Sequence, residues 1–550
     1  MLWGMKHRDR EDVVVLGSGA AGLTAAILAH DRGAKVLVVE RTGKVGGTTA
    51  VSGGGIWIPM NHHMHEVGVQ DSREEALAYC KAIAMGKVED HLIETFVDTA
   101  PGMLRYLEER TPLKFSAMTA TDYHAELPGG KLSGRSVEPQ PFDTNTLGEW
   151  RKKLRPPSSS PFPVTRQEAF GAFDAFYRPW TIPQDLVAER MGKGIVALGQ
   201  ALAAGLLKAV LDRKIPILLD TRAKALIVEG GKVVGVRVER DGAPMDIRVK
   251  GAVVLATAGF EWNESLKSRF LGGPIAGANT PPFNEGDGLV MAMEAGADLA
   301  NMGELWHFPS IMIPGEVYEN RPLARGIVAE RSGPHVIWVN AQGRRFVNEA
   351  ANYNSVGKTL FEIDTSRHAY RNLPAWAILD SQYRRQYVLG TTMPEDPDPD
   401  WLPRAETLQQ LATLVGIDPK GLEETVARWN GFVRQGKDFD YDKGDSAYDR
   451  FQGDKEAPNA NLGTIEKPPF YALRVHTGAL GTKGGPRTNG KAQVMNVRGL
   501  PIPGLYAAGN VAASIAGPGY YGRGATLGPA MTWGYIAGAC AADDAKGEKR

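Results

Sequence analysis

DVVVLGSGAAGLTAAILAHDRGAKVLVVER, residues 12–41, is the most informative stretch of this chain. It predicts an apolar strand, a glycine turn, an alanine-rich helix and a second strand that ends at Glu40. Gly17, Gly19 and Gly22 have the spacing that a tight turn, a close approach to a pyrophosphate and close packing of helix on strand require. Glu40 stands where an acidic side chain accepts hydrogen bonds from ribose hydroxyls. The stretch therefore predicts a dinucleotide-binding unit, with a glycine-rich turn of another doubly wound fold as the alternative.

A second glycine-rich segment, RTGKVGGTTAVSGGGIWIPMN (residues 41–61), directly follows this unit. A nicotinamide enzyme has no need of such a segment at this place. FAD runs extended past the second strand, and both its pyrophosphate and its isoalloxazine need close backbone approach, which glycine permits. The segment therefore favours FAD over a nicotinamide as the cofactor.

The composition is that of a globular protein with more than one domain. The 550 residues are 43% hydrophobic and 23% charged, and Lys plus Arg equals Asp plus Glu at 63 each, which argues against a nucleic-acid partner. The two cysteines, Cys80 and Cys540, favour a reducing cytoplasm over a disulfide framework. The longest apolar helical stretch, residues 198–211, is too short to span a bilayer, and the chain start has no signal-peptide pattern. We expect a cytoplasmic protein without a transmembrane segment, for which peripheral membrane contact stays open.

Later strand patterns predict a nucleotide domain interrupted by insertions. Residues 213–242 contain short strands with a hairpin turn at Gly230 and Gly231, and residues 251–263 form a buried strand ending in small residues. We expect an α/β fold with a Rossmann-like FAD-binding domain and an inserted α+β substrate (catalytic) domain. The expected boundaries are 1–120, 190–280 and 475–550 for the FAD-binding domain, 121–189 for a helical segment of the substrate domain, and 281–474 for the substrate domain itself. The basic cluster of residues 149–155 is predicted to be a solvated face.

These motifs resemble those of the succinate dehydrogenase/fumarate reductase flavoprotein superfamily. The likeness near the N-terminus rests on the three glycines, on Glu40, on GGTT (residues 46–49) and on SGGGIWIP (residues 52–59), and the last of these is similar to the 3-ketosteroid dehydrogenase branch. VVLATAGFEWN, VNAQGRRFVNEAANY, GTKGGPRTN and GLYAAGNVAASIAGPGYYGRGATLGPAMT follow in the order typical of a 3-ketosteroid Δ1-dehydrogenase. The resemblance covers nearly the whole chain. It implies an FAD-dependent enzyme that introduces a C1–C2 double bond into a 3-ketosteroid and passes electrons to an external acceptor, a quinone or a dye-like compound.

The resemblance also implies which residues surround FAD, bound without a covalent link. In the family the final glycine-rich segment lies against the isoalloxazine, and the helix after it points its N-terminus at the flavin edge that gathers negative charge on reduction. The expected cofactor contacts are Gly17, Gly19, Ala20, Ala21, Gly22, Glu40, Arg41, Gly46, Gly47, Thr48, Thr49, Ser52, Gly53, Gly54, Ala258, Gly259, Gly509, Asn510, Thr526 and Leu527.

The catalytic residues implied by the resemblance are three tyrosines and a glycine. Tyr520 and Gly524 would donate hydrogen bonds to the C3 carbonyl of the steroid, which stabilises the developing enolate. Tyr353 would take the C2 proton with the help of Tyr123, while the C1 hydride goes to flavin N5. The family more often has two tyrosines where this chain has Tyr123 and His124, so His124 is a further candidate for the proton relay.

Several neighbouring side chains receive weaker interpretations. Arg523 faces either the pocket mouth or solvent, and Tyr521 and Tyr506 are interpreted as structural. The histidines of NHHMH, residues 61–65, have no cysteine or carboxylate set beside them in sequence. We therefore expect a surface turn or a wall there, and neither a metal site nor a covalent link to flavin.

Three other functions stay open. A 3-ketosteroid Δ4-dehydrogenase could use the same carbonyl clamp. A fumarate-reductase-like ene or enone reductase would need cationic partners for paired carboxylates. A flavin-binding module without chemistry is the non-enzymatic alternative.

Overall fold

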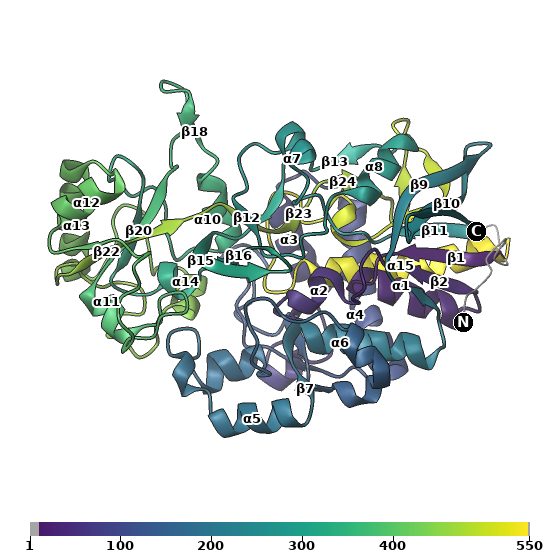
Figure 1. Ribbon diagram of the computed structural model, residues 1–550, viewed down its shortest axis with the longest axis horizontal. Helices are drawn as coiled ribbons and strands as arrows, with labels where there is room; N and C mark the ends of the chain where they lie inside the picture. The colour runs from purple at the N-terminus through teal and green to yellow at the C-terminus, as the bar shows by residue number, and fades with distance from the viewer. Residues whose placement is uncertain (1–9, 548–550) are drawn as a thin grey trace.

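The structure, a computed structural model, describes residues 10–547 (Figure 1). The chain start used in the signal-peptide argument and the last three residues lie outside this range. The largest sheet has eight strands in the order β25-β26-β11-β1-β2-β8, with β10 paired to β11 and β9 to β10. Its strands are β1 (Glu11–Leu16), β2 (Val36–Val39), β8 (Ile217–Leu218), β9 (Thr221–Glu229), β10 (Lys232–Arg240), β11 (Ala243–Leu255), β25 (Gln493–Met495) and β26 (Pro501–Ala507). Strands from the beginning, the middle and the end of the chain therefore share one sheet.

The centre of this sheet is parallel. β1 pairs in parallel with β2 and with β11, and β11 pairs in parallel with β26. Every residue of β2 is buried, as is typical of a parallel strand covered on both faces. The strand, helix and second strand predicted for residues 12–41 are confirmed, with helix α1 (Ala20–Asp31) between β1 and β2. The predicted hairpin turn at residues 230–231 is also confirmed, between β9 and β10.

Helix α15 (Leu527–Ala545) packs against α1 beside the sheet (Figure 1). The contact is close because Gly534 and Gly538 lack side chains. A Cβ on either would lie 2.3 Å from a carbonyl oxygen of α1, that of Ala21 or Ala25. Helices α4 (Asp90–Arg110) and α6 (Leu198–Asp212) add buried apolar side chains to the same core. Helix α15 thus packs onto the strand–helix–strand unit of residues 12–41, although the two lie far apart in the sequence.

A second lobe lies at the end of the molecule away from the two termini, drawn green in Figure 1. Its sheet has the order β17-β20-β22-β21, with β17 (Val336–Val339), β20 (Ala375–Asp380), β21 (Arg404–Ala405) and β22 (Phe470–Val475), all antiparallel. Helices α12 (Leu408–Val415) and α13 (Pro419–Gln435) pack on this sheet and bury Leu411 and Trp429 against Ile337. This lobe has its own apolar core.

A third region lies below the large sheet in Figure 1 and contains helix α5 (Gln184–Gly192). A small antiparallel sheet β3-β5-β4 belongs to it, with β3 (Ile56–Trp57), β4 (Phe115–Ala117) and β5 (Ser136–Pro139). Arg135 is 1% exposed and forms ion pairs with Asp71 and Asp122, at 2.7 and 2.9 Å. These ion pairs hold Asp122, which directly precedes Tyr123, close to the start of β5 and to Asp71.

The remaining elements named in Figure 1 connect these regions. They are α2 (Gly47–Val51), α3 (Arg73–Ala84), β7 (Ile195–Val196), α7 (Glu264–Phe270), β12 (Gly277–Ala278), α8 (Asp287–Glu294), β13 (Leu299–Ala300), β15 (Ser310–Tyr318), β16 (Arg321–Gly326), α10 (Tyr353–Thr359), β18 (Ile363–Asp364), α11 (Ser381–Gln386), α14 (Ala447–Gln452), β23 (Gly478–Thr482) and β24 (Gly485–Pro486). The domain boundaries given above stay a prediction.

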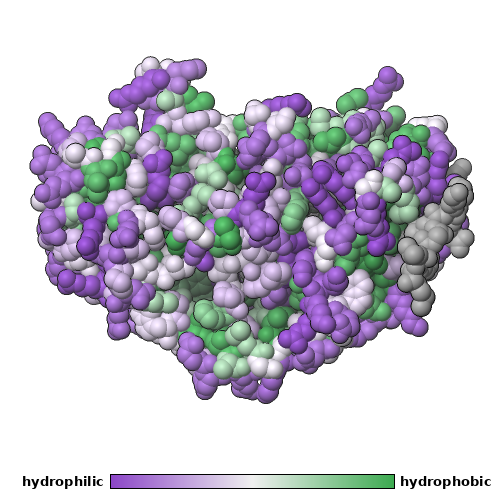
Figure 2. All heavy atoms as spheres, viewed as in Figure 1, coloured by the Kyte–Doolittle hydropathy of each residue, from purple (hydrophilic) through white to green (hydrophobic). Residues whose placement is uncertain are grey.

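The basic cluster at residues 149–155 is only partly a solvated face. Arg151, Lys152 and Lys153 are exposed, but Arg155 is 1% exposed and pairs with Glu319 at 2.5 Å. The expectation was therefore wrong for Arg155, because a distant strand-end carboxylate compensates its buried charge. Within residues 10–547 no helix is both long and apolar enough to cross a bilayer, and the face in Figure 2 is largely hydrophilic with scattered apolar residues.

Candidate active site

A large cavity runs from the parallel sheet to the second lobe. Its empty space, including solvent at the open mouth, is about 2080 Å³. Residues 17–21 and Glu40 line one end, and Tyr123, Tyr353 and Tyr520 line the other. The cavity therefore has room for an extended dinucleotide and for a second ligand beside it.

Most of the predicted cofactor contacts line this cavity. They are Gly17, Gly19, Ala20, Ala21, Glu40, Arg41, Gly47, Thr48, Thr49, Ser52, Gly53, Gly54, Ala258, Gly509, Asn510, Thr526 and Leu527. Gly22, Gly46 and Gly259 were also predicted as contacts, but they lie behind the wall. A Cβ on Gly22 would be 2.1 Å from the Gly17 carbonyl oxygen, and one on Gly259 would be 2.2 Å from Thr482 Oγ1. These glycines allow close packing of the wall.

Two helices present open N-termini to the cavity. α1 begins after Gly19 and α15 after Thr526, and neither N-cap residue makes a side-chain cap hydrogen bond. The Ala20 N–H donates to Thr49 Oγ1 at 2.9 Å. The positive end of a helix dipole favours an anion at such a place. At α15 this is the dipole alone, because the N–H groups of Leu527 and Gly528 already donate to the Gly524 carbonyl oxygen. A pyrophosphate at α1 and an electron-rich flavin edge at α15 fit these two ends.

Glu40 is held in place for a ribose. Its carboxylate accepts hydrogen bonds from Ser18 Oγ at 2.6 Å and from the Thr42 N–H at 2.9 Å. The sequence analysis identified Glu40 but not Ser18 or Thr42, which orient it. The donor set and the glycine turn therefore fit FAD.

Three tyrosine rings meet at the far end of the cavity. The ring centroids of Tyr123 and Tyr353 are 5.3 Å apart, those of Tyr123 and Tyr520 5.0 Å, and those of Tyr353 and Tyr520 5.5 Å. The Tyr123 hydroxyl donates to the Tyr353 hydroxyl at 2.6 Å. These side chains come from positions up to 397 residues apart in the sequence, since 520 − 123 = 397. The structure brings the three predicted tyrosines together as one group.

Burial dominates the ionisation of these phenols. It raises the pKa of Tyr353 well above the ordinary value, with Tyr520 and Tyr448 adding to the rise, whereas the hydrogen bond from Tyr123 lowers it. Burial likewise raises the pKa of Tyr123, and the positive charge of Arg523 lowers it in part. All three tyrosines are therefore protonated at neutral pH, and Tyr353 can act as a base only if its own proton moves on as it accepts another.

Gly524 supplies a backbone donor next to the tyrosines. Its φ is +89°, and a Cβ there would lie 2.3 Å from the Gly55 backbone, so only glycine fits. Its N–H makes no hydrogen bond with any residue in the range 10–547. A free N–H that lines the cavity is available to a carbonyl oxygen of a bound ligand.

Comparisons with known proteins identify the family. The FAD binding domain family matches residues 12–527. The chain belongs to this family. It is 40% identical to a 4-oxocyclohexanecarboxylate 2-dehydrogenase of Sinomonas cyclohexanicum, over 98% of this chain and 94% of that one. It is 38% identical to a 3-oxosteroid 1-dehydrogenase of Mycolicibacterium smegmatis, over 96% of each chain.

A solved structure is similar over the whole molecule. The crystal structure of 3-ketosteroid delta1-dehydrogenase from Sterolibacterium denitrificans, in complex with 1,4-androstadiene-3,17-dione, gives a TM-score of 0.91 at 38% identity and covers 98% of this chain and 100% of that one. The family resemblance, the FAD-binding α/β fold and the assignment as an FAD-dependent oxidoreductase are thereby confirmed.

His124, where the FAD-dependent family more often has tyrosine, does not line the cavity. Its Nε2 accepts a hydrogen bond from Asn352 Nδ2 at 3.0 Å, and burial lowers its pKa. Asn352 is the N-cap of α10, because its Oδ1 accepts from the Ser355 N–H at 3.0 Å. His124 therefore positions the start of α10, where Tyr353 is the first residue.

Several residues of the tyrosine end were missed. Arg166, Phe308 and Gln452 line the cavity, and Tyr448 packs on Tyr123 with ring centroids 4.9 Å apart. Arg523 also lines it, although the sequence left its direction open. Arg166 lies in a stretch of short helical turns where the family resemblance gave no motif. Gln452 and Tyr448 come from the short helix α14, whose sequence carries no signal for a pocket.

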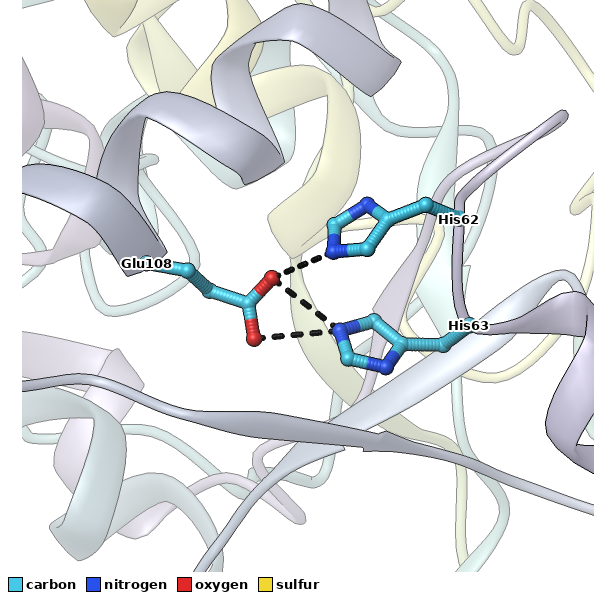
Figure 3. A group of neighbouring side chains, drawn as sticks. All are labelled: His62, His63 and Glu108. Atoms are coloured by element: carbon cyan, nitrogen blue, oxygen red, sulfur yellow. Dashed lines mark hydrogen bonds and ion pairs between the residues drawn. The ribbon is translucent and has the colours of Figure 1, made fainter.

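The histidine segment lies outside this cavity and has carboxylate neighbours after all (Figure 3). His62 and His63 both direct Nε2 at Glu108 of α4, with closest N–O distances of 2.6 and 3.0 Å. The expectation that no carboxylate stands nearby was wrong, because Glu108 is 45 residues from His63 in sequence.

Proposed function

We propose that the protein dehydrogenates a 3-ketosteroid between C1 and C2, and that the reaction needs only the ring ketone and its two neighbouring carbons. The observation that carries the proposal is the group of Tyr123, Tyr353, Tyr520 and Gly524 in the cavity that also holds the FAD contacts. The names of two relatives support it, since a 3-oxosteroid and a 4-oxocyclohexanecarboxylate both contain a six-membered ring ketone.

The ketone oxygen is bound between two donors. The Tyr520 hydroxyl and the Gly524 N–H donate to it, and both bonds strengthen as charge moves onto the oxygen. Loss of one such donor typically costs about 3–4 kcal/mol of transition-state stabilisation. The two donors make the neighbouring C2–H acidic enough for a protein base.

Tyr353 is the proposed base, and Tyr123 is its relay partner. One proton leaves the Tyr123–Tyr353 pair for solvent before or during the step, so that Tyr353 reacts as a tyrosinate stabilised by the hydrogen bond from Tyr123. The Tyr353 oxygen then accepts the C2 proton. The Arg523 charge, which lowers the pKa of Tyr123, favours the same ionised pair. FAD, when bound, supplies the acceptor for the C1 hydride. The electron pair left at C2 then forms the C1–C2 double bond.

Two enzymatic alternatives are distinguished by chemistry. A fumarate-reductase-like enzyme binds dicarboxylates through cations, and this cavity does contain Arg166 and Arg523. Succinate, however, has no ketone for Tyr520 and Gly524 to polarise. A Δ4-dehydrogenase could use the same clamp, and the position of the new double bond tells the two apart.

We also propose non-covalent FAD, an external quinone or dye-like electron acceptor and a cytoplasmic location. Within the described part of the chain, the cavity wall contains no histidine or cysteine to attach a flavin. The thiols of Cys80 and Cys540 are both free, which suits a reducing compartment.

The test is anaerobic mixing of the holoenzyme with 4-androstene-3,17-dione, with succinate as control. Bleaching of the flavin by the steroid, with formation of the 1,4-diene, supports the proposal. Bleaching by succinate alone, or a steroid product with a new double bond elsewhere, refutes it.

A further inference from the structure

Two guanidinium groups line the tyrosine end of the cavity, those of Arg166 and Arg523. The guanidinium of Arg166 makes no hydrogen bond or ion pair with any residue between 10 and 547. It lies over the ring of Phe176 at 5.4 Å and faces Gly53, where a Cβ would be 3.0 Å from its Nε. The guanidinium of Arg166 therefore lines the cavity without a hydrogen-bonded protein partner.

Among the described residues, the guanidinium of Arg523 has one hydrogen-bond partner. Its guanidinium lies 3.8 Å from the ring centroid of Phe170 and donates one hydrogen bond, to Gln452 Oε1 at 2.7 Å. Of its five N–H donors, the others remain available. The residue directly precedes Gly524 and follows Tyr520 by three positions. Its side chain therefore starts from the same loop as both proposed donors to the ketone.

At the nucleotide end of the cavity, the arginine side chains form ion pairs with carboxylates. At the nucleotide end, Arg41 pairs with Asp287 and Glu285, and Arg155 pairs with Glu319. Glu40 and Asp287 are the carboxylates of the wall, and both stand at that end. In the described structure, the wall of the tyrosine end therefore contains two cations and no carboxylate. The nearest anion is the buried Glu138, whose charge compensates that of Arg166 only in part.

Unpaired buried cations are costly unless a ligand compensates them. Burial and the charge of Arg523 together lower the pKa of Arg166 to about 10, although the Glu138 carboxylate acts in the opposite direction. A carboxylate would accept two parallel hydrogen bonds from a guanidinium and remove this repulsion. An uncharged steroid offers the two arginines no such partner.

We propose that Arg166 and Arg523 form a subsite for a carboxylate on the substrate, so that the preferred substrate is a six-membered ring ketone that carries an acid group. This rests on the proposed function, because the ketone still binds to Tyr520 and Gly524. The reaction is the same dehydrogenation as in the proposed function. The carbon next to the ketone loses a proton to Tyr353, the following carbon loses a hydride to the flavin, and a double bond forms between them.

The test compares three compounds in anaerobic flavin bleaching by the holoenzyme. They are 4-oxocyclohexanecarboxylate, its methyl ester and the neutral 4-androstene-3,17-dione. The acid and the ester differ in charge and by one methyl group. We expect the acid to reduce the flavin with an efficiency, rate over apparent dissociation constant, at least 10-fold higher than the ester. Equal efficiencies for acid and ester, or reduction by the steroid but not by the acid, would overturn the carboxylate subsite and leave the proposed function standing. No bleaching by any of the three would refute the proposed function itself.

Substitution of each arginine tests whether its side chain causes the preference for the acid over the ester. Arg166→Met and Arg523→Met should each lower the acid-to-ester efficiency ratio by about 10–100-fold, as expected for a lost hydrogen-bonded charge pair. Arg474→Met is the matched control, since Arg474 also lies over a ring, that of Trp376 at 4.9 Å, but outside the cavity. Flavin content is measured for each variant. An unchanged ratio, or a loss of flavin with acid and ester affected equally, would assign the arginines to the cofactor and overturn the inference.

A separate observation points to a metal site at His62, His63 and Glu108 (Figure 3). One ligand atom from each lies within 4.8 Å of the others. His63 contacts Glu66 Oε1 through Nδ1 at 2.5 Å and Glu108 through Nε2 at 3.0 Å. With the Nδ1 proton held by Glu66, Nε2 can bind a metal ion in place of its contact with Glu108. A carboxylate behind a ligating histidine is the usual arrangement at zinc sites. Glu108 Oε1 already accepts from the Phe115 N–H at 3.1 Å, so Oε2 is the freer ligand.

We infer that these three residues bind one divalent ion of the zinc class, with water as a fourth ligand. The contacts of His62 and His63 with Glu108 must open for an ion to enter between the ligand atoms. The site would join the loop of residues 61–65 to α4.

The metal inference is tested with Zn²⁺ and Co²⁺ on the holoenzyme. We expect one bound zinc per chain by mass spectrometry after dialysis and a visible Co²⁺ absorption of tetrahedral type. Both should be lost in His63→Ala and in the isosteric Glu108→Gln, but not in His91→Ala, whose imidazole is exposed. If His63→Ala does not fold, Glu108→Gln alone carries the test. No bound metal in the wild type, or equal metal in Glu108→Gln, would overturn this inference.

Discussion

Tyr353 and Tyr520 are neighbours in the cavity, but removing their hydroxyls should have different effects. Tyr353→Phe removes the base and leaves the carbonyl clamp, so steroid binding should survive while flavin reduction slows by about 10²–10⁴-fold. Tyr520→Phe removes a bond that exists before the reaction, so binding should weaken as well as reduction. Stopped-flow reduction at several steroid concentrations separates the two effects.

Tyr506→Phe is the matched control for this pair, because Tyr506 is buried but bonds to Asp544 outside the cavity. Deuterium at C2 should also wash out with oxidised flavin only when Tyr353 is intact, since enolisation does not need the hydride step. Wild-type reduction rates in Tyr353→Phe would place the base elsewhere.

The raised pKa of Tyr353 gives a direction for the pH profile. The base must lose a proton before or during the step, so the rate of flavin reduction should rise with pH. Because burial lifts this pKa above its ordinary value, the rise should continue to about pH 10 without a plateau. A histidine base such as His124, with its pKa lowered by burial, would instead give a plateau above about pH 7. Single-turnover reduction between pH 6 and 10 tells them apart.

The residues around Tyr353 show what a sequence can and cannot reveal. Tyr123, Tyr353, Tyr520 and Gly524 were identified because each sits in a motif. Arg166 was not predicted, because no motif in the neighbouring sequence indicates that this cationic side chain lines a cavity. Glu108 was missed for a similar reason: the chain folds back to bring it to the histidine segment, and no spacing rule anticipates that contact.

At the level of elements, helix α10 is positioned through a buried histidine. His307, the last residue of β14 (Leu305–His307), packs against α10, where a Cβ on Gly357 would lie 2.4 Å from the His307 Cβ. Burial lowers the pKa of His307 from 6.5 to about 3, with Lys483 and Lys358 adding to the effect. The folded protein therefore requires this imidazole to be neutral.

The consequence is a loss of stability in acid. Between pH 6.5 and about 3 the unfolded chain binds a proton at residue 307 and the folded chain does not. The free energy of unfolding should fall by up to about 1.4 kcal/mol per pH unit from this group as pH drops. His307→Gln should flatten that part of the profile in urea unfolding at pH 7, 6, 5 and 4, whereas His91→Gln should not. Parallel profiles for His307→Gln and the wild type would contradict the prediction.

The secondary structure was predictable where the signal is local. The unit of residues 12–41 and the hairpin turn at residues 230–231 follow from alternating strand, glycine and helix patterns. Helix α14 was not predictable, because a six-residue helix has little periodicity. It is held by tertiary contacts such as the hydrogen bond that the Tyr177 hydroxyl donates to the Gln452 carbonyl oxygen at 2.8 Å.

For the whole molecule, the cavity wall draws on segments far apart in the chain, and its ligand should hold them together. Removing FAD by acid ammonium sulfate should leave a yellow supernatant and a colourless protein, if the link is non-covalent. Adding FAD back at 100 times its dissociation constant should stabilise the protein by about 2.7 kcal/mol. Thermal unfolding with and without FAD measures this gain. A flavin that stays with the pellet, or a melting temperature that ignores added FAD, would contradict the prediction.

The close contact between α1 and α15 has a consequence for biosynthesis. β26 and α15 both come from the last 50 residues, so the first βαβ unit leaves the ribosome long before its partner strand and covering helix exist. During translation the apolar side of α1 has no glycine-bearing neighbour to bury it. The flavin site therefore cannot form until α15 has been synthesised, and chaperones have hundreds of residues of elongation in which to bind that exposed helix.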